Sequence, residues 1–317
     1  MLLSPIDDHE FYDFSHGFRS GHSQHDALKE FERHCWEENT HWIVDADVSG
    51  FFDNLDHALL REFIQTRVND GGVKRLSGKW LTAGVVEAGQ RTRSKQGTPQ
   101  GGVISPLLAN IFLHYVLDEW FVKEVQPRMR GRCFLVRYAD DFIIGFEKEE
   151  DARRVMDVLP KRFARFGLRI HPEKTKLVRF GRPPRGDAPE GNGTVDFLGI
   201  TYFWAKSRRG KWIIKKKTRG ARVNRFVKSI WQWCRINRHE PLEEQHKQLC
   251  LKLRGHYQYY AVNHNYQALN DVWHHSKRAW HYWLSKRCSK GVLIWDNFES
   301  IMNAKFPLPR SRILHQI

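Results

Sequence analysis

The spacing of apolar positions divides the chain into strand-like and helix-like stretches. In residues 42–48 the side chains follow a period of two, which predicts a β-strand that has Asp45 and Asp47 on one face. Residues 24–35 and 149–166 repeat their apolar positions every three to four residues, which predicts amphipathic helices. Asp47 therefore stands at the end of a predicted strand, where a catalytic ligand would sit.

A second strand-like stretch, residues 134–146, carries two acids at its centre. Apolar, β-branched and aromatic residues on both sides predict two short strands, and Tyr138-Ala-Asp-Asp predicts the tight turn of a hairpin. Asp140 and Asp141 repel each other, so the arrangement makes most sense with a cation between them and a negatively charged partner. A solvated turn is the alternative for this dipeptide alone, because Asp is a preferred turn residue.

Two loops rich in glycine precede this hairpin. In residues 14–23, Arg19 is placed to meet a phosphate or a template strand, although a plain connecting loop fits equally well. Residues 96–102 read Gln-Gly-Thr-Pro-Gln-Gly-Gly, a shaped loop whose bare backbone can approach a ligand, without the spacing of a phosphate-binding P-loop. A helix is predicted next, with Ser105 as its N-cap and Pro106 at its first position.

The C-terminal third differs from the rest in both pattern and charge. Residues 204–214 predict a basic hairpin, and three helical stretches after about Arg219 predict a bundle. Residues 1–200 carry 28 Lys and Arg against 30 Asp and Glu, whereas residues 201–317 carry 24 against 6. This excess predicts binding to a polyanion, and nucleic acid fits better than membrane; a solvated basic face is the alternative.

Composition narrows the class of protein. A chain of 317 residues can bury a full core and suits one large or two moderate domains. It has no apolar run of about 18 residues and no secretory leader, so we expect a cytoplasmic protein with no membrane segment. Its five cysteines are scattered, without a Cys-x-x-Cys pair, so neither a disulfide framework nor a zinc site is expected.

The predicted elements follow one another as β-α-β-β-α-β. That order predicts an α+β fold with a split βαβ, ferredoxin-like sheet covered by helices on one face. At its exposed face Asp47 could meet Asp140 and Asp141. Three carboxylates suit two Mg²⁺ ions, because Mg²⁺ prefers hard oxygen ligands and accepts substrate phosphates as the rest of its shell. One ion would activate a primer 3′-hydroxyl, and the other would bind the triphosphate.

Taken together, the motifs resemble a group II intron-encoded reverse transcriptase/maturase over nearly the whole chain. They are Phe14-Ser-His-Gly-Phe-Arg, Asp47-Val-Ser-Gly-Phe-Phe-Asp-Asn, Gln96-Gly-Thr-Pro-Gln-Gly-Gly, Tyr138-Ala-Asp-Asp, residues 167–176, Phe197-Leu-Gly and Leu253-Arg-Gly-His-Tyr-Gln-Tyr-Tyr. The resemblance implies a right-hand polymerase palm with partial fingers in residues 1–217. It implies an α-helical thumb or maturase domain, which binds RNA, in residues 218–317.

The resemblance also assigns roles to residues of this chain. The catalytic metal ligands are Asp47, Asp140, Asp141 and the backbone carbonyl of Val48, with two Mg²⁺ ions for which Mn²⁺ can substitute. The nucleotide-binding residues are Phe52 under the sugar, Gln100 along the incoming nucleotide, Tyr138, Ala139 and Lys174. The residues for template, primer or intron RNA are Arg19, the primer grip Phe197, Leu198 and Gly199, and Arg254, His256 and Tyr257.

Two functions follow from the resemblance. The first is an RNA-directed DNA polymerase that extends a primer with dNTPs and binds its intron RNA and DNA target for splicing and retrohoming. The chain begins after the first fingers block and has no paired Cys or His nuclease motif after Arg312, so the second is a truncated, polymerase-inactive splicing cofactor. A retron or defence-associated reverse transcriptase fits less well, because residues 253–260 resemble maturases.

Overall fold

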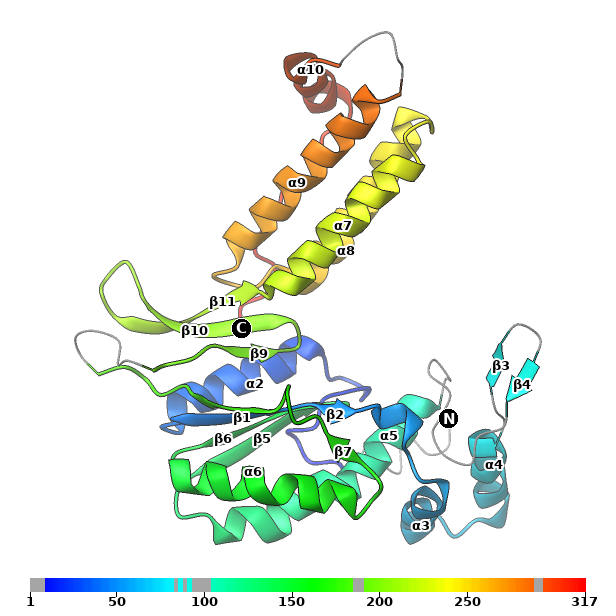
Figure 1. Ribbon diagram of the computed structural model, residues 1–317, viewed down its shortest axis with the longest axis vertical. Coiled ribbons are helices and arrows are strands. Elements are labelled where there is room, and N and C mark those ends of the chain that lie inside the picture. Colours follow the sequence, from blue (N-terminus) through cyan, green and yellow to red (C-terminus); the bar gives the residue numbers. More distant parts are fainter. Residues whose placement is uncertain (1–8, 83–84, 88–89, 93–103, 185–190, 288–292) are drawn as a thin grey trace. The chain divides into compact units, whose positions relative to one another are not determined.

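The computed structural model describes residues 9–82, 85–87, 90–92, 104–184, 191–287 and 293–317 (Figure 1). The chain divides into two compact units, residues 1–198 and residues 199–317. The sequence predicted a boundary between residues 217 and 218. The observed boundary comes earlier, between residues 198 and 199, because the β-hairpin that follows it belongs to the second unit. Each unit contains its own buried apolar cluster.

A four-stranded antiparallel sheet forms the centre of the first unit, with the strand order β5-β6-β1-β8. Its strands are β1 (Trp42–Ala46), β5 (Cys133–Tyr138), β6 (Asp141–Phe146) and β8 (Lys176–Arg179). Strand β6 pairs with both β1 and β5, so it lies between two strands that a helical crossover connects. This is the predicted split βαβ sheet, and the predicted α+β class is confirmed.

Helices cover both faces of this sheet, whereas the order of elements predicted them on one face. Among the described residues of the first unit, the α-helices are α2 (Gln24–Glu37), α3 (His57–Arg67), α4 (Gly71–Thr82), α5 (Ser105–Leu113) and α6 (Glu149–Ala164). Val44 and Ile144 join the apolar cluster of α5 and α6, while Phe31 of α2 contacts Phe134 of β5. Helices α2 and α6 thus lie on opposite sides of the sheet (Figure 1). The difference arises because α2 precedes the βαββαβ unit in the chain.

Local signals explain where two of these helices begin. Helix α2 starts after Ser23, whose hydroxyl and the Asp26 carboxylate form a reciprocal capping box. Helix α3 is capped by Asp56, whose carboxylate accepts hydrogen bonds from the backbone N–H groups of Ala58 and Leu59.

Helix α5 differs from its prediction at its N-terminal end. Ser105 is the first helical residue rather than the N-cap, which is Ile104, and its side chain makes no capping bond. After Leu113 the chain continues helically through two π-helical stretches, η2 (His114–Asp118) and η3 (Phe121–Val125), and a 3₁₀ turn, η4 (Gln126–Arg128). Such π-helical turns are uncommon and frequently accompany functional sites.

Short elements complete the first unit. Strand β2 (Val48–Ser49) pairs with β7 (Arg169–Ile170), and β3 (Val85–Glu87) pairs with β4 (Gln90–Thr92). A 3₁₀ turn, η1 (Phe51–Asp53), precedes α3, and β9 (Val195–Phe197) ends the unit. Because β2 follows β1 directly, the chain at Asp47 passes from one strand pairing to another.

The described residues of the second unit form a hairpin and four helices. The hairpin joins β10 (Ile200–Lys206) to β11 (Trp212–Thr218), with Gly210 at a φ of 74°, which confirms the predicted turn. Helices α7 (Gly220–Ile236), α8 (Leu242–Tyr260) and α9 (Tyr266–Ser285) are the three that were predicted, and α10 (Trp295–Lys305) was not. Within the part of the chain that the structure describes, no helix is long and apolar enough to cross a membrane.

Candidate active site

The turn of the β5–β6 hairpin carries the two adjacent acids. The strand register pairs Tyr138 with Asp141, so Ala139 and Asp140 are the two residues of the turn. Ala139 has a φ of 56°, a left-handed conformation that two-residue hairpin turns require and that costs a non-glycine residue about 1–3 kcal/mol. The surrounding structure must therefore hold this turn in place.

Asp47 lies at the same end of the sheet. In the antiparallel pairing of β1 with β6, Ala46 is the partner of Phe142. One further step along both strands puts Asp47 level with Asp141. Segments far apart in the sequence are thus brought together by the strand register, as the order of elements predicted.

A turn between β7 and β8 holds Asp47 at three points. The backbone N–H of His171 donates to the Asp47 carbonyl at 2.8 Å, and the Asp47 N–H donates to the Thr175 hydroxyl at 3.3 Å. The ammonium of Lys174 donates to the Asp47 carboxylate at 2.9 Å. Lys174, one of the predicted nucleotide-binding residues, therefore lies directly beside Asp47, and its exposed side chain can also meet an incoming anion.

The electrostatics of the site favour a cation. Burial raises the pKa of Asp140, and the nearby charge of Asp47 raises it further, against the lowering effect of Arg137. Asp140 is half-buried and Asp141 is exposed, so the site opens to solvent. Among the described residues, no three His, Cys, Asp or Glu side chains form a metal-binding group by themselves. Carboxylates are ligands that Mg²⁺ accepts, usually one or two from the protein, with substrate and water in its other positions.

The comparison with known proteins decides the family. The family described as "Reverse transcriptase (RNA-dependent DNA polymerase)" matches residues 1–202 of this chain. The chain belongs to the reverse transcriptase family. The predicted resemblance and the palm fold are thereby confirmed.

Relatives of this reverse transcriptase include proteins encoded by introns. The group II intron-encoded protein LtrA of Lactococcus lactis subsp. cremoris is 33% identical over 192 residues, which are 57% of this chain and 32% of LtrA. The protein YkfC of Escherichia coli K12 is 27% identical over 266 residues, with 73% of this chain and 65% of YkfC covered. The chain thus spans about a third of the length of LtrA.

A solved structure resembles the chain more remotely. Telomerase from Candida albicans, in complex with a fragment of telomeric RNA, has a TM-score of 0.49 at 14% sequence identity. The match covers 95% of this chain and 54% of the telomerase chain. This score is too low to add to the family assignment.

The predicted nucleotide-binding residues, and the predicted metal ligand Val48, lie in several elements of the first unit. Phe52 is half-buried in η1, edge-on to Phe51 at 5.3 Å between ring centroids. Val48 is buried in β2, and Tyr138 is half-buried, with its pKa raised by that burial. Gln100 lies outside the described residues, as does the loop of residues 96–102 around it.

Arg19 and the predicted primer grip occupy different settings. Arg19 donates from one guanidinium nitrogen to the carbonyls of Tyr12 and Ser15, both at 2.8 Å. This nitrogen therefore stabilises the loop that contains Arg19. Phe197 is buried, while Leu198 and Gly199 follow it with φ of 48° and 79°. Two successive left-handed residues make a sharp turn after β9.

The three predicted RNA-binding residues of α8 are placed differently from one another. Arg254 is exposed, whereas His256 and Tyr257 are buried in the helical core of the second unit. His256 packs against Phe226 at 4.3 Å between ring centroids, and burial lowers its pKa to about 4. Of the three side chains, only Arg254 lies where RNA can reach it.

Sequence reasoning missed the residues that support the turn of the β5–β6 hairpin. Arg137 and Asp118 are both fully buried, and they form an ion pair beside the turn. The available signal was a lone arginine inside the apolar run of β5, because a buried cation requires a buried carboxylate. No sequence pattern indicated that Asp118 would supply it.

Proposed function

We propose that this chain is the polymerase part of a group II intron-encoded, RNA-directed DNA polymerase. It extends a primer 3′-hydroxyl with dNTPs on an RNA template, and its partners are the intron RNA and a DNA primer or target. The observation that carries the proposal is the register of β1 with β6, whose last pair, Ala46 with Phe142, brings Asp47 to the end of the sheet that carries Asp140 and Asp141. Family membership supports it.

We assign two Mg²⁺ ions, or Mn²⁺ in their place, to Asp47, Asp140, Asp141 and the Val48 carbonyl. Bound there, they would neutralise charge that develops on the transferred phosphate. The protein's own contribution is positional: the turn of residues 171–175 holds Asp47, and the β5–β6 hairpin holds the other two carboxylates. Burial, and after it the charge of Asp47, raises the pKa of Asp140, and a bound cation would offset both effects.

The nucleotide and the nucleic acid are assigned to residues around this centre. Phe52 is proposed to lie under the sugar and exclude a 2′-hydroxyl, with Gln100, Tyr138 and Ala139 along the nucleotide. Lys174 is proposed to contact the triphosphate, because its ammonium already lies 2.9 Å from Asp47. Arg19 and residues 197–199 are proposed to contact template and primer.

The second unit is proposed to bind intron RNA through its exposed basic side chains. Arg222, Arg225 and Lys228 are exposed on α7 and recur every three positions, so they share one side of that helix. Arg254 adds an exposed cation on α8. Basic residues outnumber acidic ones fourfold in residues 201–317, and phosphate contacts of this kind dominate affinity for nucleic acid.

Primer extension on an RNA template tests the proposal. Asp47→Asn and Asp140→Asn should each lower the Mg²⁺-dependent rate by at least about 10²-fold, a usual cost of losing one electrostatic contact to a transition state. Asp45→Asn is the matched control, because Asp45 lies on the same strand but pairs with Lys176 at 3.8 Å, away from the hairpin turn. A folded protein that binds RNA with salt-sensitive affinity but incorporates no dNTP would be a splicing cofactor instead, and the proposal would be wrong.

A further inference from the structure

A buried ion pair lies directly behind the catalytic turn. Arg137 of β5 and Asp118 at the end of η2 are both completely buried. The Arg137 Nε donates to Asp118 at 2.8 Å, and a second guanidinium nitrogen donates to the other carboxylate oxygen at 2.5 Å. Desolvation offsets much of the attraction in such a pair, so an apolar pair of similar size is often equally stable. Stability alone therefore does not explain why these charges are buried here.

The remaining guanidinium nitrogen of Arg137 points to the turn. Its Nη1 donates to the Ala139 carbonyl at 3.0 Å and to the Asn110 side-chain oxygen at 3.0 Å. Ala139 is the left-handed residue of the turn, and its carbonyl belongs to the peptide bond that leads into Asp140. The arginine thus fixes the orientation of the peptide that presents the first catalytic carboxylate, and Asp118 fixes the arginine.

The N-terminal segment holds the same turn from another direction. The Asn110 side-chain amide donates to the Gly17 carbonyl, and a Cβ on Gly17 would lie 2.2 Å from the Ala139 nitrogen. The backbone N–H of His16 donates to the Arg137 carbonyl at 2.9 Å. Gly17 therefore touches the turn with bare backbone, and Asn110 links it to Arg137.

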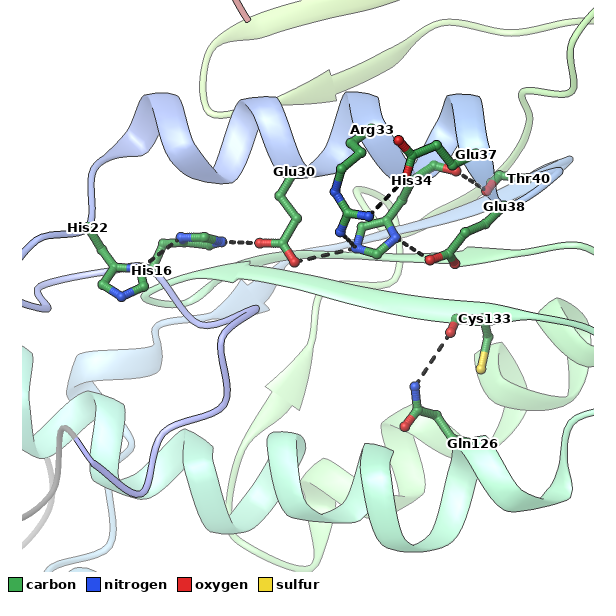
Figure 2. A network of polar contacts seen from close by, with 10 residues as sticks. All are labelled: His16, His22, Glu30, Arg33, His34, Glu37, Glu38, Thr40, Gln126 and Cys133. Atoms are coloured by element: carbon green, nitrogen blue, oxygen red, sulfur yellow. Dashed lines mark hydrogen bonds and ion pairs between the residues drawn. The ribbon is translucent and has the colours of Figure 1, made fainter.

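A second polar network anchors this segment to α2 (Figure 2). The His16 ring lies between His22, at 3.1 Å, and the Glu30 carboxylate, toward which it points. Glu30 also contacts His34 at 3.4 Å, and His34 contacts Glu38 at 2.6 Å. These contacts fix the chain before Gly17 to helix α2, so the backbone of Gly17 restrains the position of the turn.

We propose that Arg137, with Asp118 as its counter-ion and Asn110 as its link to Gly17, is a positioning residue for Asp140 and Asp141. It touches neither nucleotide nor primer and acts through the Ala139 carbonyl. The inference rests on the proposed polymerase function. It adds that the reaction depends on a buried assembly behind the three acids.

The test replaces the ion pair with an apolar pair. Arg137→Met alone leaves Asp118 buried and unpaired, so it should unfold at a lower temperature. The double variant Arg137→Met/Asp118→Leu should recover most of that stability, because it buries no unpaired charge. It still lacks the donor to Ala139, so kcat should remain lower by about 10²-fold, the usual effect of a displacement near 1 Å, while the KM for dNTP stays close to wild type.

Two further variants separate positioning from folding. Arg137→Lys keeps a cation beside Asp118 but lacks the fork that reaches both Asp118 and the turn, so it should recover stability and only part of kcat. Asp151→Asn is the stability control, because this buried carboxylate of α6 accepts from the Arg130 and Gly131 N–H groups away from the turn. It should lower the melting temperature and leave kcat unchanged.

Mn²⁺ binding, measured by electron paramagnetic resonance without substrate, gives a readout independent of turnover. The double variant should bind Mn²⁺ more weakly than wild type, because its two turn carboxylates are less ordered. If wild type incorporates no dNTP but this difference is found, the proposed function fails and the positioning role stands. If the folded double variant matches wild type in Mn²⁺ affinity and, where turnover is seen, in kcat, the positioning role is refuted.

Discussion

Replacing Gly17 with alanine should slow primer extension by displacing the catalytic turn. The added Cβ would lie 2.2 Å from the Ala139 nitrogen and 3.0 Å from its Cα, whereas ordinary van der Waals contact begins at 3.4 Å. Gly17 does not have a positive φ, so alanine can adopt its backbone conformation. The substitution therefore perturbs the contact with the turn and little else.

The size of the effect follows from this geometry. Because the neighbour is backbone and not a flexible side chain, Gly17 and the turn must separate by about 1 Å, which can cost about 10²-fold in rate. That corresponds to about 2.7 kcal/mol in activation free energy. Overpacking at a buried contact should also lower the free energy of unfolding by about 1–3 kcal/mol.

Single-turnover primer extension at saturating dNTP, combined with thermal melting, measures both quantities. Gly71→Ala is the matched control, because Gly71 begins α4 and a Cβ there would meet nothing within 4 Å. It should leave both the rate and the melting temperature nearly unchanged. A Gly17→Ala protein that is folded at the assay temperature and extends primer at the wild-type rate would refute the reasoning.

Two further predictions concern stability and RNA binding. Burial raises the pKa of Glu30, but hydrogen bonds from His16 and His34 outweigh burial and lower it from 4.5 to about 2. The ionised form of Glu30 therefore stabilises the fold fully above about pH 4.5, and less as the pH falls toward 2. The melting temperature of wild type should drop more steeply over this interval than that of Glu30→Gln. Parallel curves of melting temperature against pH would contradict this. Replacing Arg222 or Arg225 with Gln should weaken RNA binding and reduce the slope of log affinity against log salt by about 0.7–1 for each phosphate that the protein no longer neutralises. Filter binding at several salt concentrations measures this slope. Unchanged slopes would exclude RNA binding by this side of α7.

The hairpin and the strand with Asp47 were predictable because their signals are local. Alternation with a period of two identified the strand, and β-prone runs on both sides of a short turn identified the hairpin. The capping of α2 and the three helices α7, α8 and α9 follow equally from spacing. Element ends were less predictable: the N-cap of α5 differs by one residue, because several neighbouring positions satisfy the same preference.

Burial in the second unit could not be predicted in the same way. His256 and Tyr257 lie in a motif-like run beside the exposed Arg254, and an aromatic or histidine next to an arginine suits both an RNA contact and a helix core. Helix α8 turns His256 toward α7, where its ring meets Phe226. Only the packing of helices decides which face of α8 is buried.

At the catalytic turn the two kinds of information separate most clearly. The sequence by itself determined that Asp140 and Asp141 sit on a hairpin turn and that Asp47 ends a strand, since residue type and period are local properties. What supports the turn was decided only by the tertiary structure. Arg137 and Asp118 come from different elements, so only the fold brings them together. Gly17 is far from the turn in sequence, and a glycine is needed there only because its backbone packs against Ala139.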